Sequence, residues 1–235
     1  MMYHSFRSLM VFFICLVVMI LPAQVCAADN SPDTLFVYSG AGLKAPMTEI
    51  GELFEEKTGI VVEYNFAGSG TLISQMEISK KGDAFIPGGT PDYSIAQNKS
   101  LVSDPAYVAY HVPVIGVQPG NPHGITSARD LAKEGLKLAL GDVNATAIGR
   151  QGQKLFTKLG IDADIEENVI LRAPTINEVV TALKLRQVDA ALITIDQIKG
   201  DEIEAVQLKD DENMALVIPI GLTTFTTKQD SAQQF

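Results

Sequence analysis

The chain has 235 residues, of which 46% are hydrophobic and 20% charged, a composition typical of a globular rather than a disordered protein. Asp and Glu outnumber Lys and Arg by 28 to 18, which gives a formal net charge of −10 at pH 7. Affinity for nucleic acid comes largely from Lys and Arg that displace counterions from phosphates. The acidic balance therefore argues against nucleic acid as the main ligand.

The first 27 residues are typical of a secretory signal peptide. They contain Arg7, no acidic residue and the apolar run 9–21, and they end in Val25-Cys26-Ala27, a small-residue cleavage site. The run is shorter than the about 20 residues that a membrane-spanning helix needs. Lipoprotein processing at Cys26 is disfavoured because Val25 is bulky. We expect cleavage after Ala27 and export to the periplasm or another extracytoplasmic location.

Strands and helices alternate along the remaining chain, with glycine-bearing loops between them. The predicted strands, in order, are residues 34–38, 60–66, 85–86, 107–117, 136–140, 169–172, 188–194 and 214–222. Helices are predicted to begin near residues 46, 71, 146 and 175, the first of them ending at Gly59. This alternation predicts an α/β protein with largely parallel sheets. The two long apolar segments, 107–117 and 214–222, are interpreted as crossings between two lobes.

The mature chain carries no pattern typical of catalysis or metal binding. Both cysteines lie in the signal peptide, so thiol nucleophiles and thiolate metal sites are excluded. His111 and His123 are far apart and lack metal-ligand spacing, so we interpret both as surface or structural residues. There is no nucleophile elbow and no Walker A sequence. We expect a protein that is not an enzyme and holds no metal or cofactor.

Four loops that precede helices are candidates for an anion site: residues 39–42, 67–71, 146–149 and 174–176. A helix N-terminus presents unpaired N–H donors and the positive end of the helix dipole. Ser69, Thr71 and Thr175 add hydroxyl donors to these loops. The alternative is that these glycines and hydroxyls only cap helices and turn the chain.

Several segments resemble the periplasmic molybdate-binding proteins of ABC importers. They are residues 36–43 (FVYSGAGL), 54–60 (FEEKTGI), 67–72 (AGSGTL), 81–86 (KGDAFI), 141–142, 148–150 and 188–193. The resemblance implies a two-lobed periplasmic-binding-protein fold, type II-like, with flanking helices and a ligand cleft between the lobes. On this basis one lobe comprises residues 28–112 with 216–235, and the other comprises residues 113–215.

The resemblance also implies how a tetrahedral oxyanion would be held. Ser69 keeps a ligand-binding hydroxyl, while Ile148 and Ile176 match positions that act through their backbone N–H groups. Gly42 stands where the family usually has Ser, and Thr194 where it often has Tyr. Ser39 is a candidate for the hydroxyl that Gly42 lacks. These departures weaken the case for molybdate more than the case for oxyanion binding.

The sequence thus predicts a monomeric solute-binding protein that passes molybdate or tungstate to an importer permease and its ATPase. One alternative keeps the fold and changes the ligand to another oxyanion or a small organic anion. Others are a secreted enzyme on this fold, a sensor or an adhesin. Residues 230–235 are expected to begin a helix, and we expect the sequence to be incomplete at this end because the family usually continues further.

Overall fold

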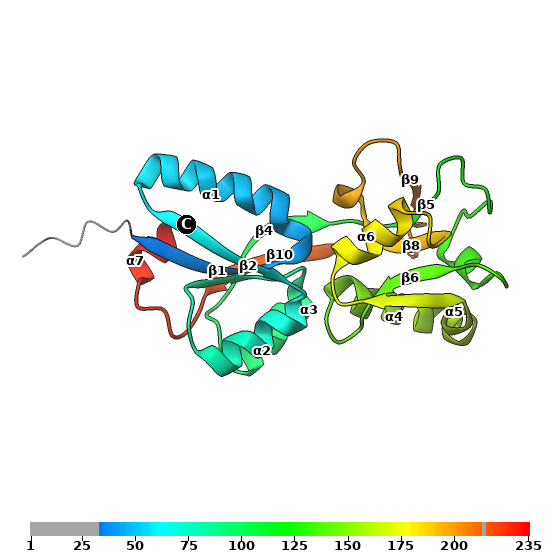
Figure 1. The fold of residues 1–235 in the computed structure, drawn as a ribbon. Helices are drawn as coiled ribbons and strands as arrows, with labels where there is room; N and C mark the ends of the chain where they lie inside the picture. The colour runs from blue at the N-terminus through cyan, green and yellow to red at the C-terminus, as the bar shows by residue number, and fades with distance from the viewer. Residues whose placement is uncertain (1–32, 213–214) are drawn as a thin grey trace, which may run out of the picture. The chain divides into compact units, whose positions relative to one another are not determined.

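The computed structural model describes residues 33–212 and 215–235, which form a two-sheet α/β arrangement (Figure 1). The predicted signal peptide lies outside the described residues. Among the described helices, none has the length and apolar character needed to cross a bilayer.

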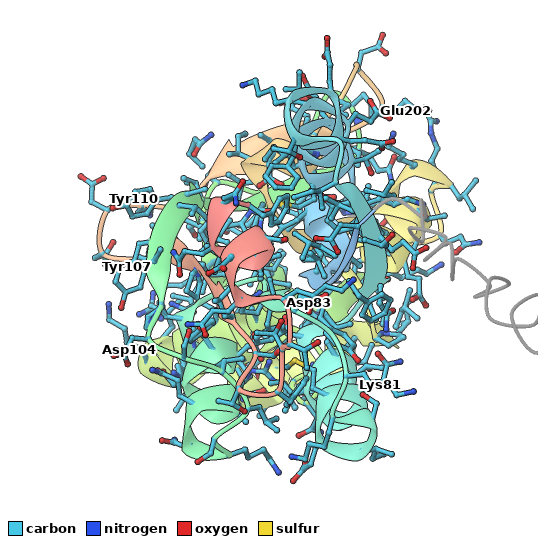
Figure 2. All side chains as sticks on the ribbon, turned by 90° about the vertical axis from the view of Figure 1, so that its left-hand side faces the viewer. Lys81, Asp83, Asp104, Tyr107, Tyr110 and Glu202 are labelled. Atoms are coloured by element: carbon cyan, nitrogen blue, oxygen red, sulfur yellow. The ribbon has the colours of Figure 1, made fainter. Side chains whose placement is uncertain are left out.

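The first sheet, here called sheet 1, has five strands in the order β2-β1-β3-β10-β4. Their bounds are β1 (Thr34–Gly40), β2 (Val61–Ala67), β3 (Ala84–Ile86), β4 (Ala106–His111) and β10 (Leu216–Leu222). β1 pairs with β2 and β3 in parallel, whereas β10 pairs with β3 and β4 in antiparallel orientation. β4 is consequently an edge strand, and Tyr107 and Tyr110 on it are largely exposed (Figure 2).

Helices cover both faces of sheet 1 (Figure 1). They are α1 (Lys44–Thr58), α2 (Ser69–Ser79), α3 (Thr90–Asn98) and α7 (Gln229–Gln234). α1 lies on one face and α2 with α3 on the other. Since side chains alternate across a strand, neighbouring residues of β1 contribute to the cores on the two faces. Val37 belongs to the core under α1, and its neighbour Tyr38 belongs to the core under α2 and α3. α1 ends at Gly59, as predicted, with a left-handed φ of 74°.

The second sheet, sheet 2, has the order β7-β6-β8-β5-β9. Its strands are β5 (Pro113–Val117), β6 (Leu138–Gly141), β7 (Val169–Ala173), β8 (Ala190–Thr194) and β9 (Glu204–Gln207), and its helices are α4 (Ala147–Leu159), α5 (Asp162–Asn168) and α6 (Ile176–Lys184). α6 covers one face and α4 with α5 the other (Figure 1). Three 3-10 turns, Ala41–Leu43, Ala128–Ala132 and Ile195–Gln197, complete the regular structure of the described residues.

The α/β class with flanking helices is confirmed, but the sheets are mixed rather than largely parallel. β5 pairs in antiparallel orientation with β8 and β9, as β10 does with β3 and β4. β5 follows the first passage of the chain between the sheets, and β10 follows its return. Each of them runs opposite to the strands of the repeating strand-helix units in its sheet. The predicted single segment 107–117 is in fact two strands, β4 and β5, in different sheets.

Residues 33–235 form one compact unit. The division into one lobe of residues 28–112 with 216–235 and another of residues 113–215 therefore stays a prediction. All strands of sheet 1 nevertheless lie in the first of these two ranges, and all strands of sheet 2 lie in the second.

Candidate ligand-binding site

A cavity of about 50 Å³ lies where helices from both sheets begin. From the sheet 1 side it is lined by Gly40, Ala41, Gly42, Leu43, Ala67, Gly68, Ser69, Gly88, His111 and Leu216. From the sheet 2 side it is lined by Thr146, Ala147, Ile148, Thr175, Ile176 and Thr194. All four loops that the sequence indicated as candidates contribute to this lining.

The helix starts at the cavity are built by local capping. Thr146 caps α4, with its Oγ1 accepting from the Gly149 N–H at 3.0 Å, and Thr175 caps α6 by accepting from the Glu178 N–H at 3.4 Å. Each cap satisfies the N–H of the third helical residue. The N–H groups of the first two residues of each helix have no acceptor within their own helix. Among them are the N–H groups of Ile148, the second residue of α4, and Ile176, the first residue of α6. They are available to a ligand.

Of the six predicted ligand-binding residues, the structure brings five together at the cavity: Gly42, Ser69, Ile148, Ile176 and Thr194. Ser69 is 3% exposed, and its Oγ accepts from the Gly88 N–H at 3.1 Å, which leaves its hydroxyl hydrogen to be donated. Ser39 is fully buried and is not among the lining residues. That these residues contact a ligand stays a prediction.

His111 is a cavity residue that sequence reasoning interpreted as surface or structural. It is the last residue of β4, buried in the cavity wall although its neighbour Tyr110 is exposed. Its Nδ1 lies 2.8 Å from Oδ1 of Asp196 in the 3-10 turn after β8. The two residues are 85 positions apart, so no local pattern could have joined them. The sequence feature that could have indicated a place at the site was the position of His111 in the segment 107–117, which was predicted to cross between the lobes.

Asp196 is held in its ionised form. Burial alone would raise the pKa of this carboxyl group, but hydrogen bonds from His111, Gln197 and Thr194 and the charge of His111 outweigh burial and lower the pKa to about 2. Asp196 itself does not line the cavity. It contacts the cavity wall through His111 and Thr194, whose side chains donate to its carboxylate.

Contacts between the two sets of helices enclose the cavity. The Gly70 N–H donates to the Ala145 carbonyl at 3.1 Å. The side chains of Asn177 and Gln197 each donate, at 3.0 Å, to the carbonyls of Ala41 and Gly42 respectively. Each bond joins an element of sheet 1 to an element of sheet 2, so the two sets of helices are in direct contact beside the cavity.

The cavity is mostly apolar and poor in charge. Among the described residues its lining contains no Asp, Glu, Lys or Arg, and His111 is the titratable residue in it. Within the part of the chain that the structure describes, no group of three or more His, Cys, Asp or Glu side chains could hold a metal ion. The arrangement can bind a small anion through N–H and hydroxyl groups.

Comparison with known proteins agrees with this description. A family model for bacterial extracellular solute-binding protein matches residues 35–235. A putative binding protein of Haemophilus influenzae is 31% identical over 170 residues, covering 72% of this chain and 67% of that protein. The molybdate-binding protein ModA of Mycobacterium bovis is 25% identical over 232 residues, covering 92% and 87% respectively.

Solved structures with the same fold bind different ligands. The periplasmic molybdate-binding protein of Azotobacter vinelandii has a TM-score of 0.69 at 15% identity, covering 85% of this chain and 90% of that chain. The sulfate-binding protein SubI of Mycobacterium tuberculosis has a TM-score of 0.74 at 14% identity, covering 86% and 79%. PEB3 bound to L-phospholactate has a TM-score of 0.67 at 19% identity, covering 86% and 90%. These likenesses confirm the predicted periplasmic-binding-protein fold.

Proposed function

The chain belongs to the bacterial extracellular solute-binding protein family, and we propose that it captures a tetrahedral oxyanion, molybdate or tungstate, and delivers it to an ABC importer. The residues proposed to hold the anion are the Ser69 hydroxyl and the N–H groups of Ile148, Ile176 and the loop 39–42. Thr194 lines the cavity beside them, with its hydroxyl donating to the Asp196 carboxylate. The predicted signal peptide would place this capture outside the cytoplasm.

One observation carries the proposal: four helix N-termini from two sheets meet at a small cavity without a lining carboxylate. A cavity of about 50 Å³ exceeds the roughly 10–15 Å³ that one water needs, which suits a small polyatomic anion. A hydrogen bond to a charged group contributes about 1.5–3 kcal/mol. Five or six such bonds would exceed the roughly 8 kcal/mol of a micromolar site.

The acidic net charge of −10 does not oppose anion binding. Surface charges are screened over about 10 Å at 0.1 M salt, whereas the N–H donors would touch the ligand directly. The local field at the helix starts therefore outweighs the dispersed surface charge.

Isothermal titration calorimetry tests the proposal on protein freed of bound anion by unfolding and refolding. We expect molybdate and tungstate to bind at micromolar concentration or below, and more tightly than sulfate or phosphate. Absence of heat with all four anions would contradict the proposal. Ser69→Ala should weaken binding about tenfold, whereas Ser74→Ala should not. Ser74 is the matched control because it lies on the same helix, exposed, with its hydroxyl donating to the Gly70 carbonyl.

A second candidate keeps the site and replaces the ligand with a small organic anion. A neighbouring groove of about 500 Å³ shares Ala41 and Gly42 with the cavity and also contacts Lys44 and Lys199. Ile176 and Gln197 pack against Gly42 between the two spaces, since a Cβ at Gly42 would lie 2.9 Å from Cγ2 of Ile176. An organic group that extends from the cavity into the groove would therefore have to displace one of these side chains. Native mass spectrometry of the purified protein distinguishes the candidates, because a bound organic anion adds a mass that no inorganic oxyanion matches.

A further inference from the structure

We propose that His111 binds the anion as an imidazolium, so that the site takes up a proton when it captures a doubly charged oxyanion. This inference rests on the proposed function, and it specifies that the bound ligand is a doubly charged anion. It also adds to the site a ligand-contacting residue that donates a charged hydrogen bond.

The geometry leaves one ring nitrogen of His111 for the ligand. The residue is 7% exposed and lines the cavity. Nδ1 is committed to the Asp196 carboxylate at 2.8 Å. Among the described residues the ring makes no other hydrogen bond, so Nε2, on the opposite edge of the ring, is free to contact a ligand.

The role of Nε2 depends on whether the ring is protonated. Because Nδ1 donates to a carboxylate, a neutral ring has Nε2 as a hydrogen-bond acceptor. A protonated ring has Nε2–H as a donor. A fully ionised oxyanion offers only acceptors, so it can hydrogen bond to His111 only when the ring is an imidazolium.

The charges near the cavity favour the same state. With a neutral ring, a bound dianion would add two negative charges close to the Asp196 carboxylate, and no cation lines the cavity. An imidazolium between the dianion and Asp196 offsets part of this repulsion. His111 is buried, and the low dielectric around a buried group strengthens the effect.

Among the described residues, no other charged side chain pairs with the ring from the elements around it. On β10, His111 is paired with Leu216, and the strand itself (LVIPIGL) carries no titratable residue. On α3 and α4, Asp92 and Arg150 pair with each other. On α6, Glu178 accepts from Thr175. Lys44 at the start of α1 is exposed, and Asp196 is thus the charged partner of His111.

Proton uptake gives the binding a defined pH dependence. Sulfate, molybdate and tungstate are dianions between pH 6.0 and 8.5, so any change in affinity over this range reports on the protein. Affinity should be highest at the acidic end and should fall with rising pH, by at most about tenfold per pH unit for uptake of a single proton.

Calorimetry in buffers of different ionisation enthalpy measures the number of protons taken up per anion. We expect this number to be above zero at pH 7.5, and larger there than at pH 6.0, with molybdate and with sulfate. His111→Gln should abolish the uptake, remove the pH dependence and weaken binding at pH 6.0 by about 10- to 100-fold. His123→Gln is the matched control, because His123 pairs with Asp189 at 3.3 Å and does not line the cavity.

The outcomes separate this inference from the proposed function. Absence of binding by any anion to the wild-type protein contradicts the proposed function, and the inference falls with it. Binding without proton uptake contradicts the imidazolium alone. Preferential binding of hydrogen phosphate, with an affinity that does not fall as pH rises, also overturns it, because a neutral Nε2 would then accept a hydrogen bond from the ligand.

Discussion

Asp92 on α3 and Arg150 on α4 form an ion pair that connects a helix of sheet 1 to a helix of sheet 2. The Asp92 side chain is fully buried and that of Arg150 is 18% exposed. Burial lowers the pKa of Arg150, because removing water disfavours the charged guanidinium. Arg150 also donates to the Val143 carbonyl at 2.8 Å, which fixes its orientation. The pair can form only while the two helices are in contact.

Breaking this pair is predicted to oppose closure around a ligand. Leaving one charge of a buried pair without its partner costs about 3–5 kcal/mol. If the two sets of helices separate, water hydrates the remaining charge, so the cost falls mainly on the closed state. Asp92→Asn and Arg150→Gln should each weaken anion binding at least tenfold in calorimetry, with little change in the thermal midpoint of the ligand-free protein.

The control for this pair is Lys99→Gln, which breaks the exposed Lys99–Glu77 pair of 2.8 Å within the sheet 1 helices. An exposed pair contributes about 0–1 kcal/mol, so affinity should not change. Unaltered affinity in both Asp92→Asn and Arg150→Gln would show that the pair has no part in closure.

Gly70 is predicted to be required for contact between α2 and the loop before α4. A Cβ at this position would lie 2.1 Å from the Asn144 carbonyl oxygen, which belongs to backbone and cannot move aside easily. Gly70→Ala should therefore weaken anion binding more than tenfold. Because alanine favours helix by up to about 1 kcal/mol over glycine, the ligand-free protein should keep or gain thermal stability. Equal affinity in Gly70→Ala and wild type would contradict the prediction.

The sequence predicted the elements whose signals are local. Gly59 ends α1 at the predicted residue, and the apolar spacing from Ile176 to Leu183 marks α6. Two helices were not predicted. α3 buries Asp92 together with Tyr93 and Ala96, and α5 buries Asn168 with Ile165, so neither shows an apolar stripe. Their helical form depends on packing rather than on periodicity.

The site was predictable only in its parts. Each loop before a helix was visible as a glycine or hydroxyl pattern, and the fold brings these loops together at one cavity. The pairs His111–Asp196 and Asp92–Arg150 join residues far apart in the chain, and neither has a spacing signature. The change of sheet between β4 and β5 was missed because an apolar extended segment does not indicate which sheet it joins.

Asp130 is predicted to stabilise the fold in its ionised form. Burial alone would raise the pKa of Asp130, but hydrogen bonds from Lys133, Thr126 and Ser127 outweigh it and hold the pKa well below its ordinary value. Its carboxylate completes the capping box of the 3-10 turn Ala128–Ala132. Asp130→Asn should lower the free energy of unfolding by about 1 kcal/mol at pH 7.

The pH dependence of the Asp130 effect follows from the sign of this shift. A carboxyl with a lowered folded-state pKa contributes stability above its ordinary pKa of about 3.9, and the contribution is lost as pH falls towards the folded-state value. The difference between wild type and Asp130→Asn in urea unfolding should therefore shrink below about pH 4. Asp201→Asn, at an exposed carboxyl outside any helix or strand, should show no comparable difference at either pH.

Asn177 and Gln197 are predicted to hold the loop 40–43 against the sheet 2 side of the cavity. Their side-chain amides donate to the neighbouring carbonyls of Ala41 and Gly42, both at 3.0 Å. A hydrogen bond between neutral groups contributes about 1 kcal/mol, so Asn177→Ala and Gln197→Ala should each weaken anion binding about fivefold. Because both bonds orient the same loop, the double variant should deviate from additivity.

Gln153→Ala provides the matched control for these two variants. Its amide donates to Asp162 at 2.7 Å, a bond between α4 and α5 that does not cross to sheet 1. Losing that bond should lower the thermal midpoint without changing anion affinity, whereas Asn177→Ala and Gln197→Ala should change affinity with little effect on the midpoint of the ligand-free protein. A parallel loss of stability and affinity in all three variants would mean that the Asn177 and Gln197 bonds support the fold as a whole rather than its closure around a ligand.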